Sequence, residues 1–358
     1  MINVKGFVTY LNKIVRSKYM KVFMIGGTGL LGSETAKELI SRGHHVTSIA
    51  LPDIPRGAAL PKEMEITFGN YLEMSDEELL LLMDGAEGFV FAAGIDERVE
   101  GAPPIYDLFK KYNIDPLKRL LSLAKKAGIE HSVICGSYFT HFSKKWPHLE
   151  LAKYHPYIRS RVDQENMALE FASCSFNIAI LELPYIFGIQ PGRKPVWVFL
   201  IEMIKKMKKR TYFPKGGTAM VTVKQVAQGI AGALEKNIGG QVYPFGYYNM
   251  EYKKFLKIVH KAMGYDSKRK IVTIPNFVFS MFVKRIGRQK RKENIEGGLN
   301  MSKFTKLQTS RLFILPSEGA TFLGVKDDDI EKAIEDSVKL SLEIINSQEI
   351  DLIDMKGE

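Results

Sequence analysis

The chain has 358 residues, of which 45% are hydrophobic, and it carries a formal net charge of +11. This length and apolar content allow one large domain or two intimate ones with a sizeable core, and they exclude a largely disordered chain. The apolar runs are short and end at charges, so the sequence predicts no membrane-spanning helix. The two cysteines, Cys135 and Cys174, lie in apolar runs without metal-type spacing. They predict buried reduced thiols in a cytoplasmic protein with no metal site.

The positive charge is concentrated in residues 1–19, 205–210 and 284–292. Such clusters suit an anionic substrate, a membrane surface or nucleic acid, although a basic run is more often a solvated face. No helix-turn-helix or aromatic-basic strand pattern accompanies the charge, so we expect no nucleic-acid partner.

Residues 1–19 precede the first predicted strand and place apolar residues at helical spacing among lysines. One interpretation is a basic amphipathic helix that contacts a membrane surface peripherally. The other is an upstream choice of start site, because Met20 begins a complete first strand. The segment lacks the features of a cleaved signal peptide.

A glycine turn follows the short apolar strand predicted at residues 22–25. Gly26, Gly29 and Gly32 stand three apart in the sequence GGTGLLG, and an amphipathic helix follows. The first glycine permits the turn, the second lets the backbone approach a pyrophosphate, and the third lets the helix pack on the strand. Free amides at the helix start, near Leu30, then hold the phosphates. The placement between strand and helix predicts a dinucleotide ligand.

The second strand is predicted at residues 45–51, and its tip should meet the adenosine ribose. The first acid beyond it is Asp53, which follows Pro52, and Arg56 comes in the same loop. A guanidinium there would bind a 2′-phosphate, whereas an acid would bind a 2′-hydroxyl. Arg56 favours NADP over NAD, with Asp53 as the alternative partner for NAD.

Four more strands are predicted at residues 64–68, 88–93, 132–135 and 177–183. Helices are predicted between them at residues 76–83, at 106–127 and from about 156. In the second of these, Asp115-Pro116 either starts a new helix or kinks a longer one. A loop is predicted between the fifth strand and Pro156. Six strands alternating with helices predict an α/β fold, a doubly wound parallel sheet of the Rossmann type.

From Gln190 onward the pattern loosens. Helices are predicted at residues 196–209, 251–263 and 328–345, and a strand at 218–223 leads into a helix with one apolar stripe. We expect a basic extension at 1–19 and a nucleotide-binding domain at 20–188, to which 218–235 return. A smaller substrate-binding lid at 189–325 and a C-terminal helix within 326–358 follow.

With these landmarks in order, the chain resembles the extended short-chain dehydrogenase/reductase superfamily, in particular its NAD-dependent epimerase/dehydratase branch, over about residues 20–264. The matching landmarks are the glycine turn, Gly69-Asn70, Ala92-Ala93-Gly94, Asn113, Ser137, LPYIFG at 183–188 and MVTVKQVAQGI at 220–230. The resemblance implies cofactor binding by Gly26, Thr28, Gly29, Leu30, Leu31, Gly32, Asn70, Ala92, Ala93, Gly94, Arg161, Pro184 and Ile186.

In that family a tyrosine, a lysine four residues later and a serine or threonine carry the chemistry. Ser137 and Tyr157 match, but Arg161 stands in the lysine position. Arginine is permanently charged and its fork fits a vicinal diol, although it cannot release a proton to a relay. In one hypothesis Arg161 lowers the pKa of Tyr157, which exchanges a proton with a substrate oxygen that Ser137 orients. In the other, Arg161 impairs catalysis and the protein is an NADP-binding sensor or scaffold.

Purely structural roles for the same residues are also possible. Tyr157 could be an aromatic at a helix start, Ser137 a strand-end cap, and Arg161 a partner for Glu165 at i+4. His141, His148 and His155 fit no metal-binding helix and are expected to be surface histidines of a loop.

The resemblance also implies a substrate and an assembly. The substrate would be a sugar nucleotide, whose diphosphate Arg193, Lys194 and residues 205–210 could hold. A lipid-like substrate is the next hypothesis, motivated by Phe277, Phe279 and Phe282 beside Lys284 and Arg285. Homodimers of the family pair the helices that carry Asn113 and Tyr157, so a homodimer is expected.

Overall fold

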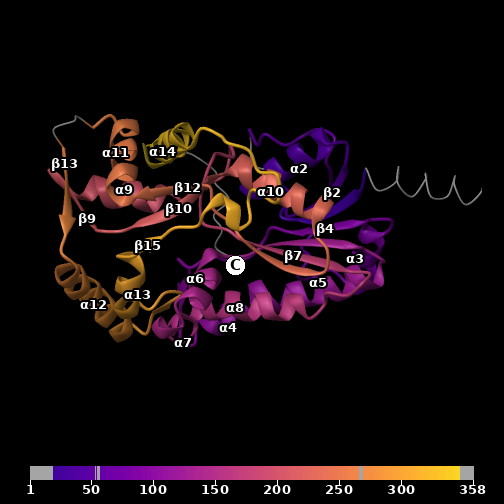
Figure 1. Ribbon diagram of the computed structural model, residues 1–358, viewed down its shortest axis with the longest axis horizontal. Coiled ribbons are helices and arrows are strands. Elements are labelled where there is room, and N and C mark those ends of the chain that lie inside the picture. The colour runs from indigo at the N-terminus through magenta and orange to yellow at the C-terminus, as the bar shows by residue number, and fades with distance from the viewer. Residues whose placement is uncertain (1–18, 53, 55–56, 266–268, 347–358) are drawn as a thin grey trace, which may run out of the picture.

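The computed structural model describes residues 19–52, 54, 57–265 and 269–346. Its larger part is a seven-stranded parallel sheet of order β11-β7-β6-β4-β1-β2-β3 (Figure 1). The strands are β1 (Lys21–Ile25), β2 (His45–Ala50), β3 (Glu65–Phe68), β4 (Gly88–Phe91), β6 (His131–Cys135), β7 (Asn177–Glu182) and β11 (Gly240–Pro244). The central strands are buried on both faces, which explains why they are apolar runs without alternation.

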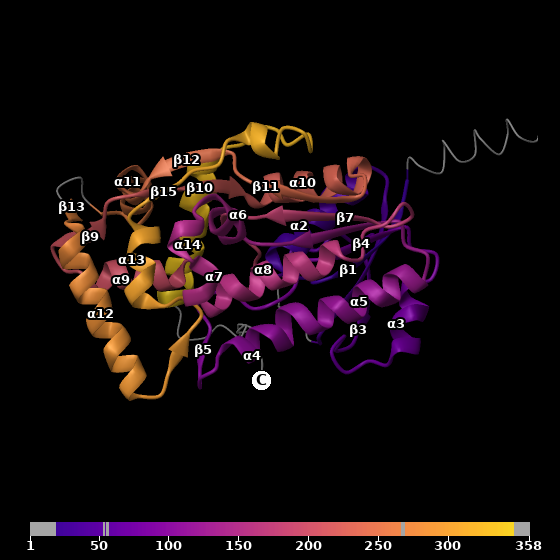
Figure 2. The ribbon, with the colours of Figure 1, turned by 60° about the horizontal axis from the view of Figure 1, so that its bottom comes forward.

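Helices cover both faces of this sheet (Figures 1 and 2). On one face, α2 (Leu30–Ser41) and α10 (Val223–Lys236) pack with the β1 residues Val22 and Met24. On the other, α3 (Asp76–Met83), α5 (Asp115–Lys126) and α8 (Pro156–Leu169) pack with Phe23 and Ile25. Adjacent β1 residues therefore contribute to opposite layers, as the two-residue period of a strand requires. This arrangement confirms the predicted doubly wound α/β fold.

The strand predicted at 218–223 does not lie in the large sheet. It forms β10 (Gly217–Thr222), which joins a four-stranded sheet of order β12-β10-β15 with β8 (Tyr185–Phe187) paired to β10. β8 pairs in parallel with β10, with Ile186 opposite Val221, and so holds that strand away from the large sheet. Only the helix α10 returns, and the seventh strand of the large sheet is β11, beside β7.

The smaller part of the molecule carries most of the elements after β8 (Figure 1). Its strands are β9 (Arg210–Pro214), β12 (Tyr248–Glu251), β13 (Lys270–Ile274) and β15 (Arg311–Leu312), and β5 (Glu100–Gly101) pairs with β14 (Glu296–Gly297). Its helices are α9 (Val198–Lys206), α11 (Tyr252–Ala262), α12 (Asn276–Lys292), α13 (Met301–Gln308) and α14 (Ile330–Asn346). In the described part of the chain no helix has the length and hydrophobicity that crossing a membrane requires.

The helix predicted at 106–127 is continuous but changes its winding. After α4 (Tyr106–Phe109) comes a π-helical turn, Lys110–Ile114, and then α5, with Pro116 at its second position. Proline lacks an N–H and cannot complete the usual i→i−4 bond, and a wider turn before it accommodates that loss. Neither of the two alternatives, a fresh start or a simple kink, describes the result fully. The wider turn carries Asn113, which is fully buried.

Two sequence expectations outside the sheet were wrong. Instead of a loop before Pro156, the chain forms α6 (Tyr138–Lys145), a 3₁₀ turn at Pro147–Leu149 and α7 (Leu151–Tyr154). The aromatic side chains of α6, among them Tyr138 and Phe142, are buried and stabilise it. Cys135 is a buried thiol as expected, and burial raises its pKa to about 12, but Cys174 is exposed.

Candidate active site

The glycine turn adopts the geometry that close packing of helix on strand demands. Gly26 has a φ of +92°, and a β-carbon there would lie 2.7 Å from the carbonyl oxygen of Ala92. A β-carbon on Gly32 would lie 2.1 Å from the carbonyl oxygen of Gly26. Both neighbours are backbone atoms, so only glycine fits at either position. The amide of Gly29 donates to the Gly26 carbonyl at 2.9 Å and closes the turn.

The start of α2 has backbone amides that no side chain caps and that could bind an anion. Its N-cap, Gly29, has no side chain that could cap the helix, and no acid lies in the first turn. The first amides of the helix, at Leu30 and Leu31, therefore present donors at the positive end of the helix dipole. Arg193, from the segment before α9, lies beside this turn. Its guanidinium donates to the Thr28 carbonyl at 3.0 Å and to the Thr28 hydroxyl at 2.9 Å.

At the tip of β4, Ala92, Ala93 and Gly94 are small residues, as the sequence indicated. Gly94 has a φ of +126°, and a β-carbon there would lie 2.5 Å from Oδ1 of Asn113. That amide accepts from the Ile95 amide at 2.8 Å and donates to the Ile95 carbonyl at 3.0 Å. The π-helical turn thus aims Asn113 at the strand tip and fixes the path of the chain leaving β4.

Tyr157 and Arg161 lie one turn apart on α8 and face each other. Nε of Arg161 donates to the Tyr157 hydroxyl at 3.1 Å, and the guanidinium carbon lies 5.2 Å from the centre of the tyrosine ring. Gln164 accepts from the same guanidinium at 2.8 Å. Both residues of the pair are buried, with Tyr157 4% and Arg161 8% exposed. The interpretation of Arg161 as a partner of Glu165 is wrong, because Glu165 pairs with Lys144.

Ser137 caps α6 at the end of β6 and also reaches the tyrosine. Its oxygen accepts from the Phe139 amide at 3.4 Å, which leaves the hydroxyl hydrogen free to donate. A hydrogen bond between Ser137 and Tyr157 lowers the pKa of the tyrosine. The strand end therefore brings Ser137 to the Tyr157–Arg161 pair, although the three residues come from two separate elements.

The expectation that Arg161 leaves Tyr157 with a lowered pKa needs correction. Burial of the hydroxyl is the largest influence and raises its pKa, Arg161 and Ser137 lower it, and the balance lies above the ordinary value of 10.0. Desolvation disfavours the phenolate more strongly than a single adjacent cation favours it.

Glu97 is an acid in this cluster that the sequence reasoning missed. It is partly buried, its charge raises the pKa of Tyr157, and Arg161 lowers the pKa of its carboxyl in turn. Burial is nevertheless the larger influence, so the pKa of Glu97 is raised. The available signal was an acid placed directly after the β4 tip, in the sequence AAGIDE.

The remaining predicted cofactor residues lie along the same edge of the sheet or outside the described residues. Asn70 lies just after β3, and the Gly69 amide before it donates to the Ala50 carbonyl. Oδ1 of Asn70 accepts from the Leu72 amide at 3.1 Å. Ile186 packs on the same apolar cluster as Leu31 and Ala92, and Pro184 is buried just before β8. Arg56 and Asp53, on which the choice between NADP and NAD depended, lie outside the described residues.

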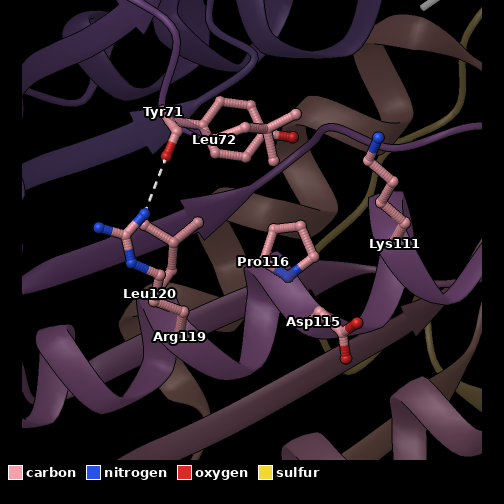
Figure 3. A pocket seen from close by; sticks show the side chains of 7 residues that line it. All are labelled: Tyr71, Leu72, Lys111, Asp115, Pro116, Arg119 and Leu120. Carbon is pink, nitrogen blue, oxygen red and sulfur yellow. Dashed lines mark hydrogen bonds between the residues drawn. The ribbon is translucent and has the colours of Figure 1, made fainter. Parts of the chain in front are cut away.

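A depression of about 250 Å³ lies between the segment after β3 and the start of α5 (Figure 3). It is lined by Tyr71, Leu72, Lys111, Asp115, Pro116, Arg119 and Leu120. Arg119 donates to the Tyr71 carbonyl at 3.4 Å and to the Met74 carbonyl at 2.6 Å. Since the Arg119 guanidinium is already bound to backbone oxygens, whereas Tyr157 lies against the Arg161 cation, we place the chemistry at Tyr157 instead.

The three histidines are not a surface set. His155 is 1% exposed, its Nδ1 accepts from the Asn300 amide at 3.0 Å, and burial lowers its pKa to about 4. His141 lies on α6, only partly exposed, while His148 is exposed. The expectation of surface loop histidines holds for His148 alone, because the predicted loop is helical and packed.

A buried ionic cluster lies between α6, α8 and the end of β7. Nζ of Lys144 is 2.8 Å from Glu165 and 2.9 Å from Glu182, and Nδ1 of His141 is 3.7 Å from Glu182. Burial raises the pKa of Glu182 from 4.5 to about 7, and the neighbouring Glu165 adds to that rise while Lys144 opposes it. The folded protein thus holds the Glu182 proton more tightly than the unfolded chain does.

We expect Glu182→Gln to remove a pH-dependent destabilisation. A carboxyl whose pKa is raised on folding destabilises the protein increasingly as pH rises from the unfolded value towards about 7. Relative to the parent protein, the variant should gain about 1–3 kcal/mol of unfolding free energy between pH 5 and pH 8. Urea unfolding at both pH values measures this, with the exposed Glu170→Gln as control. An equal offset at the two pH values would contradict the raised pKa.

Comparisons with known proteins agree with this geometry. The sequence pattern of the NAD dependent epimerase/dehydratase family matches residues 22–246. The comparison with curated protein sequences gave no match.

Solved structures share the fold over nearly the whole chain. The protein gox2253 superposes with a TM-score of 0.69 at 19% identity, over 90% of this chain and 98% of that one. A UDP-N-acetylglucosamine 4-epimerase from Methanobrevibacter ruminantium has a TM-score of 0.63 at 15% identity, over 91% and 99%. A UDP-glucuronic acid 4-epimerase from Bacillus cereus, solved with NAD, has a TM-score of 0.62 at 14% identity, over 91% and 99%.

These identities show the fold alone, whereas the family pattern spans both the glycine turn and the Tyr157 helix. The chain therefore belongs to the NAD-dependent epimerase/dehydratase family.

Proposed function

We propose that the protein is an NAD(P)-dependent oxidoreductase or epimerase that acts on a hydroxyl or keto group of a small molecule, a sugar nucleotide. The observation that carries this proposal is the 3.1 Å hydrogen bond from Arg161 to the Tyr157 hydroxyl, with Ser137 on the same hydroxyl. A tyrosine held between a cation and a second hydroxyl is equipped to pass a proton to or from a substrate oxygen.

The residues present fit a nicotinamide dinucleotide. The uncapped start of α2 would hold the pyrophosphate through the amides of Leu30 and Leu31, and Arg193 on Thr28 would add positive charge beside it. Ala92, Ala93 and Gly94 leave room along the strand tip. When bound, the nicotinamide supplies the hydride acceptor or donor. Arg56 remains our reason to favour NADP over NAD.

In this proposal each residue of the cluster has one task. When substrate is bound, the single hydroxyl hydrogen of Ser137 would turn from Tyr157 to the substrate oxygen and orient it. Tyr157 gives or takes the proton at that oxygen. Arg161 favours the phenolate by its charge and, with two nitrogens along its fork, would hold the ribose diol of the cofactor. Arg161 would thus perform the role of the usual lysine, because its guanidinium donates a hydrogen bond to the Tyr157 hydroxyl.

Removing the cation tests that role. Arg161→Met should raise the pKa of Tyr157 further, because the largest influence that lowers it would be gone. The rate in the direction that needs the phenolate should then reach its half-maximum about one pH unit higher, or more. The measurement is the pH profile of kcat/KM, with Arg159→Met as control, since Arg159 is exposed on the same helix. An unchanged profile would contradict the role of Arg161.

One experiment separates the enzyme from a cofactor-binding sensor. The purified protein is titrated with NADH and NADPH by fluorescence, and alcohols and sugar nucleotides are then screened for a change in nicotinamide absorbance. We expect binding of cofactor and turnover of at least one substrate. Tight binding without turnover, unrestored by Arg161→Lys, would instead favour the sensor.

The substrate class draws support from two sources. Sugar-nucleotide epimerases share the fold over nearly all of this chain. Glu97 beside Tyr157 offers a carboxylate to the hydroxyl groups of a sugar. A lipid-like substrate is the competing class for the same screen. We also propose a homodimer through the helices that carry Asn113 and Tyr157, which a molar mass from light scattering would test.

A further inference from the structure

The helix α12 (Asn276–Lys292) exposes nearly all of its residues to solvent. Figures 1 and 2 place it at the end of the molecule away from the seven-stranded sheet, beside α13. Over its 17 residues only Val283 is buried. Four large apolar side chains in its first half are exposed: Phe277 by 69%, Val278 by 37%, Met281 by 64% and Phe282 by 62%.

The second half of the same helix is basic. It carries six cations and no acid, namely Lys284, Arg285, Arg288, Lys290, Arg291 and Lys292. Lys290 pairs with Glu100, and within the described part of the chain the other five have no carboxylate partner. At 100° per residue, Phe277, Met281, Lys284, Arg285 and Arg288 fall on one side of the helix, opposite Val283. On this side of α12, exposed apolar residues in the first half of the helix are followed directly by basic residues in the second half.

We infer that this face of α12 docks on an anionic phospholipid bilayer. Aromatic and aliphatic side chains would enter the boundary between headgroups and acyl chains, and the neighbouring cations would contact anionic headgroups. An acidic protein or a nucleic acid would satisfy the cations but would leave Phe277, Met281 and Phe282 unexplained. A purely apolar partner would leave five cations unpaired. A bilayer with anionic headgroups matches both halves of the face.

The docking face is connected to the active site by a short stretch of chain. After α12 the chain forms β14, which pairs with β5, and reaches Gly298. The Gly298 carbonyl accepts from the Tyr157 amide at 2.9 Å, and a β-carbon on Gly298 would lie 3.0 Å from Cβ of Tyr157. Docking of α12 would therefore hold the Tyr157 end of α8 near the bilayer surface. This inference does not depend on which reaction the site performs.

The experiment is sedimentation of the full-length protein with sucrose-loaded vesicles. Vesicles of phosphatidylcholine alone are compared with vesicles that also contain phosphatidylglycerol. We expect binding to the anionic vesicles, little binding to the neutral ones, and weakening with added salt. The triple variant Lys284→Gln, Arg285→Gln, Arg288→Gln should bind about 100-fold more weakly, since each cation near an anionic surface contributes roughly fivefold.

Matched variants distinguish binding through this face of α12 from binding through net charge or through exposed apolar residues elsewhere. Lys62→Gln, Lys125→Gln, Lys126→Gln removes three exposed cations elsewhere and should leave most of the binding intact. Phe277→Ser, Met281→Ser, Phe282→Ser should lose binding, whereas Leu81→Ser with Ile238→Ser, at two exposed apolar positions, should not. Circular dichroism and thermal unfolding confirm that each variant is folded.

Several outcomes would overturn the inference. Equal loss in both charge variants would assign the binding to net charge, including the basic residues 1–19. Binding to DNA but not to vesicles would point to nucleic acid. A concentration-dependent increase in mass that the Phe277, Met281 and Phe282 substitutions abolish, without vesicle binding, would show that a second copy of the chain covers the face.

Discussion

Gly32→Ala should abolish detectable binding of NADH and NADPH at ordinary concentrations. The added methyl group would lie 2.1 Å from the Gly26 carbonyl, so the helix start must move away from the turn. Losing the hydrogen bonds of two amides to a charged phosphate, each worth about 1.5–3 kcal/mol, weakens binding on the order of 100-fold or more. Fluorescence titration measures the loss. Gly287→Ala, also in a helix, is the control, because its β-carbon would meet only Cβ of Met301 at 3.4 Å.

A second substitution tests the same amides without a backbone collision. Leu30 is the first residue of α2, where proline is well tolerated, and Gly29 before it is extended, as a residue preceding proline should be. Leu30→Pro removes one N–H from the helix start, together with the partly buried leucine side chain. We expect a roughly 10-fold or greater loss of cofactor affinity with little change in thermal unfolding. Retained affinity in both Gly32→Ala and Leu30→Pro would contradict phosphate binding at this turn.

Tyr157→Phe should reduce kcat by about 100- to 10,000-fold, because the substitution removes the group that moves the proton. The affinity for cofactor should stay within a fewfold of the parent value, since the phenylalanine ring keeps the contacts of Tyr157 with Phe109 and Phe139. Steady-state rates and cofactor titration on the same preparation measure the two quantities separately.

Tyr154→Phe is the matched control for that experiment. Tyr154 lies one helix earlier, and its hydroxyl donates to the exposed Glu150 at 3.2 Å. The control should keep its turnover. Equal turnover in Tyr157→Phe and Tyr154→Phe would exclude Tyr157 as the acid and base.

The fold was predictable because its signals are local. The central strands of the large sheet are apolar runs, Ser75 caps α3 with a capping box, and the glycine turn joins β1 to α2. What the sequence could not provide was pairing between distant segments. The sequence of residues 218–223 does not indicate that they pair with β8 in a second sheet. The sequence of residues 240–244 likewise does not indicate that they form the edge strand beside β7.

The site, like the fold, was predictable where its signals are local and not where distant segments meet. The spacing of Tyr157 and Arg161 places them on one helix face, and the structure joins them by a hydrogen bond. The pKa of Tyr157 was misjudged because burial, which depends on Phe109, Phe139 and the chain at Gly298, outweighs the adjacent cation. Glu97 was not identified, and Arg193 was assigned to the diphosphate of the substrate although it lies on Thr28 at the glycine turn. Both contacts join distant parts of the chain, which local sequence patterns do not reveal.

The most direct test of the account is a crystal structure of the protein with a bound nicotinamide coenzyme. The account predicts the pyrophosphate within hydrogen-bond distance of the Leu30 and Leu31 amides and the nicotinamide ribose beside Arg161. A coenzyme bound at another place, such as the depression near Tyr71 and Arg119, would contradict it.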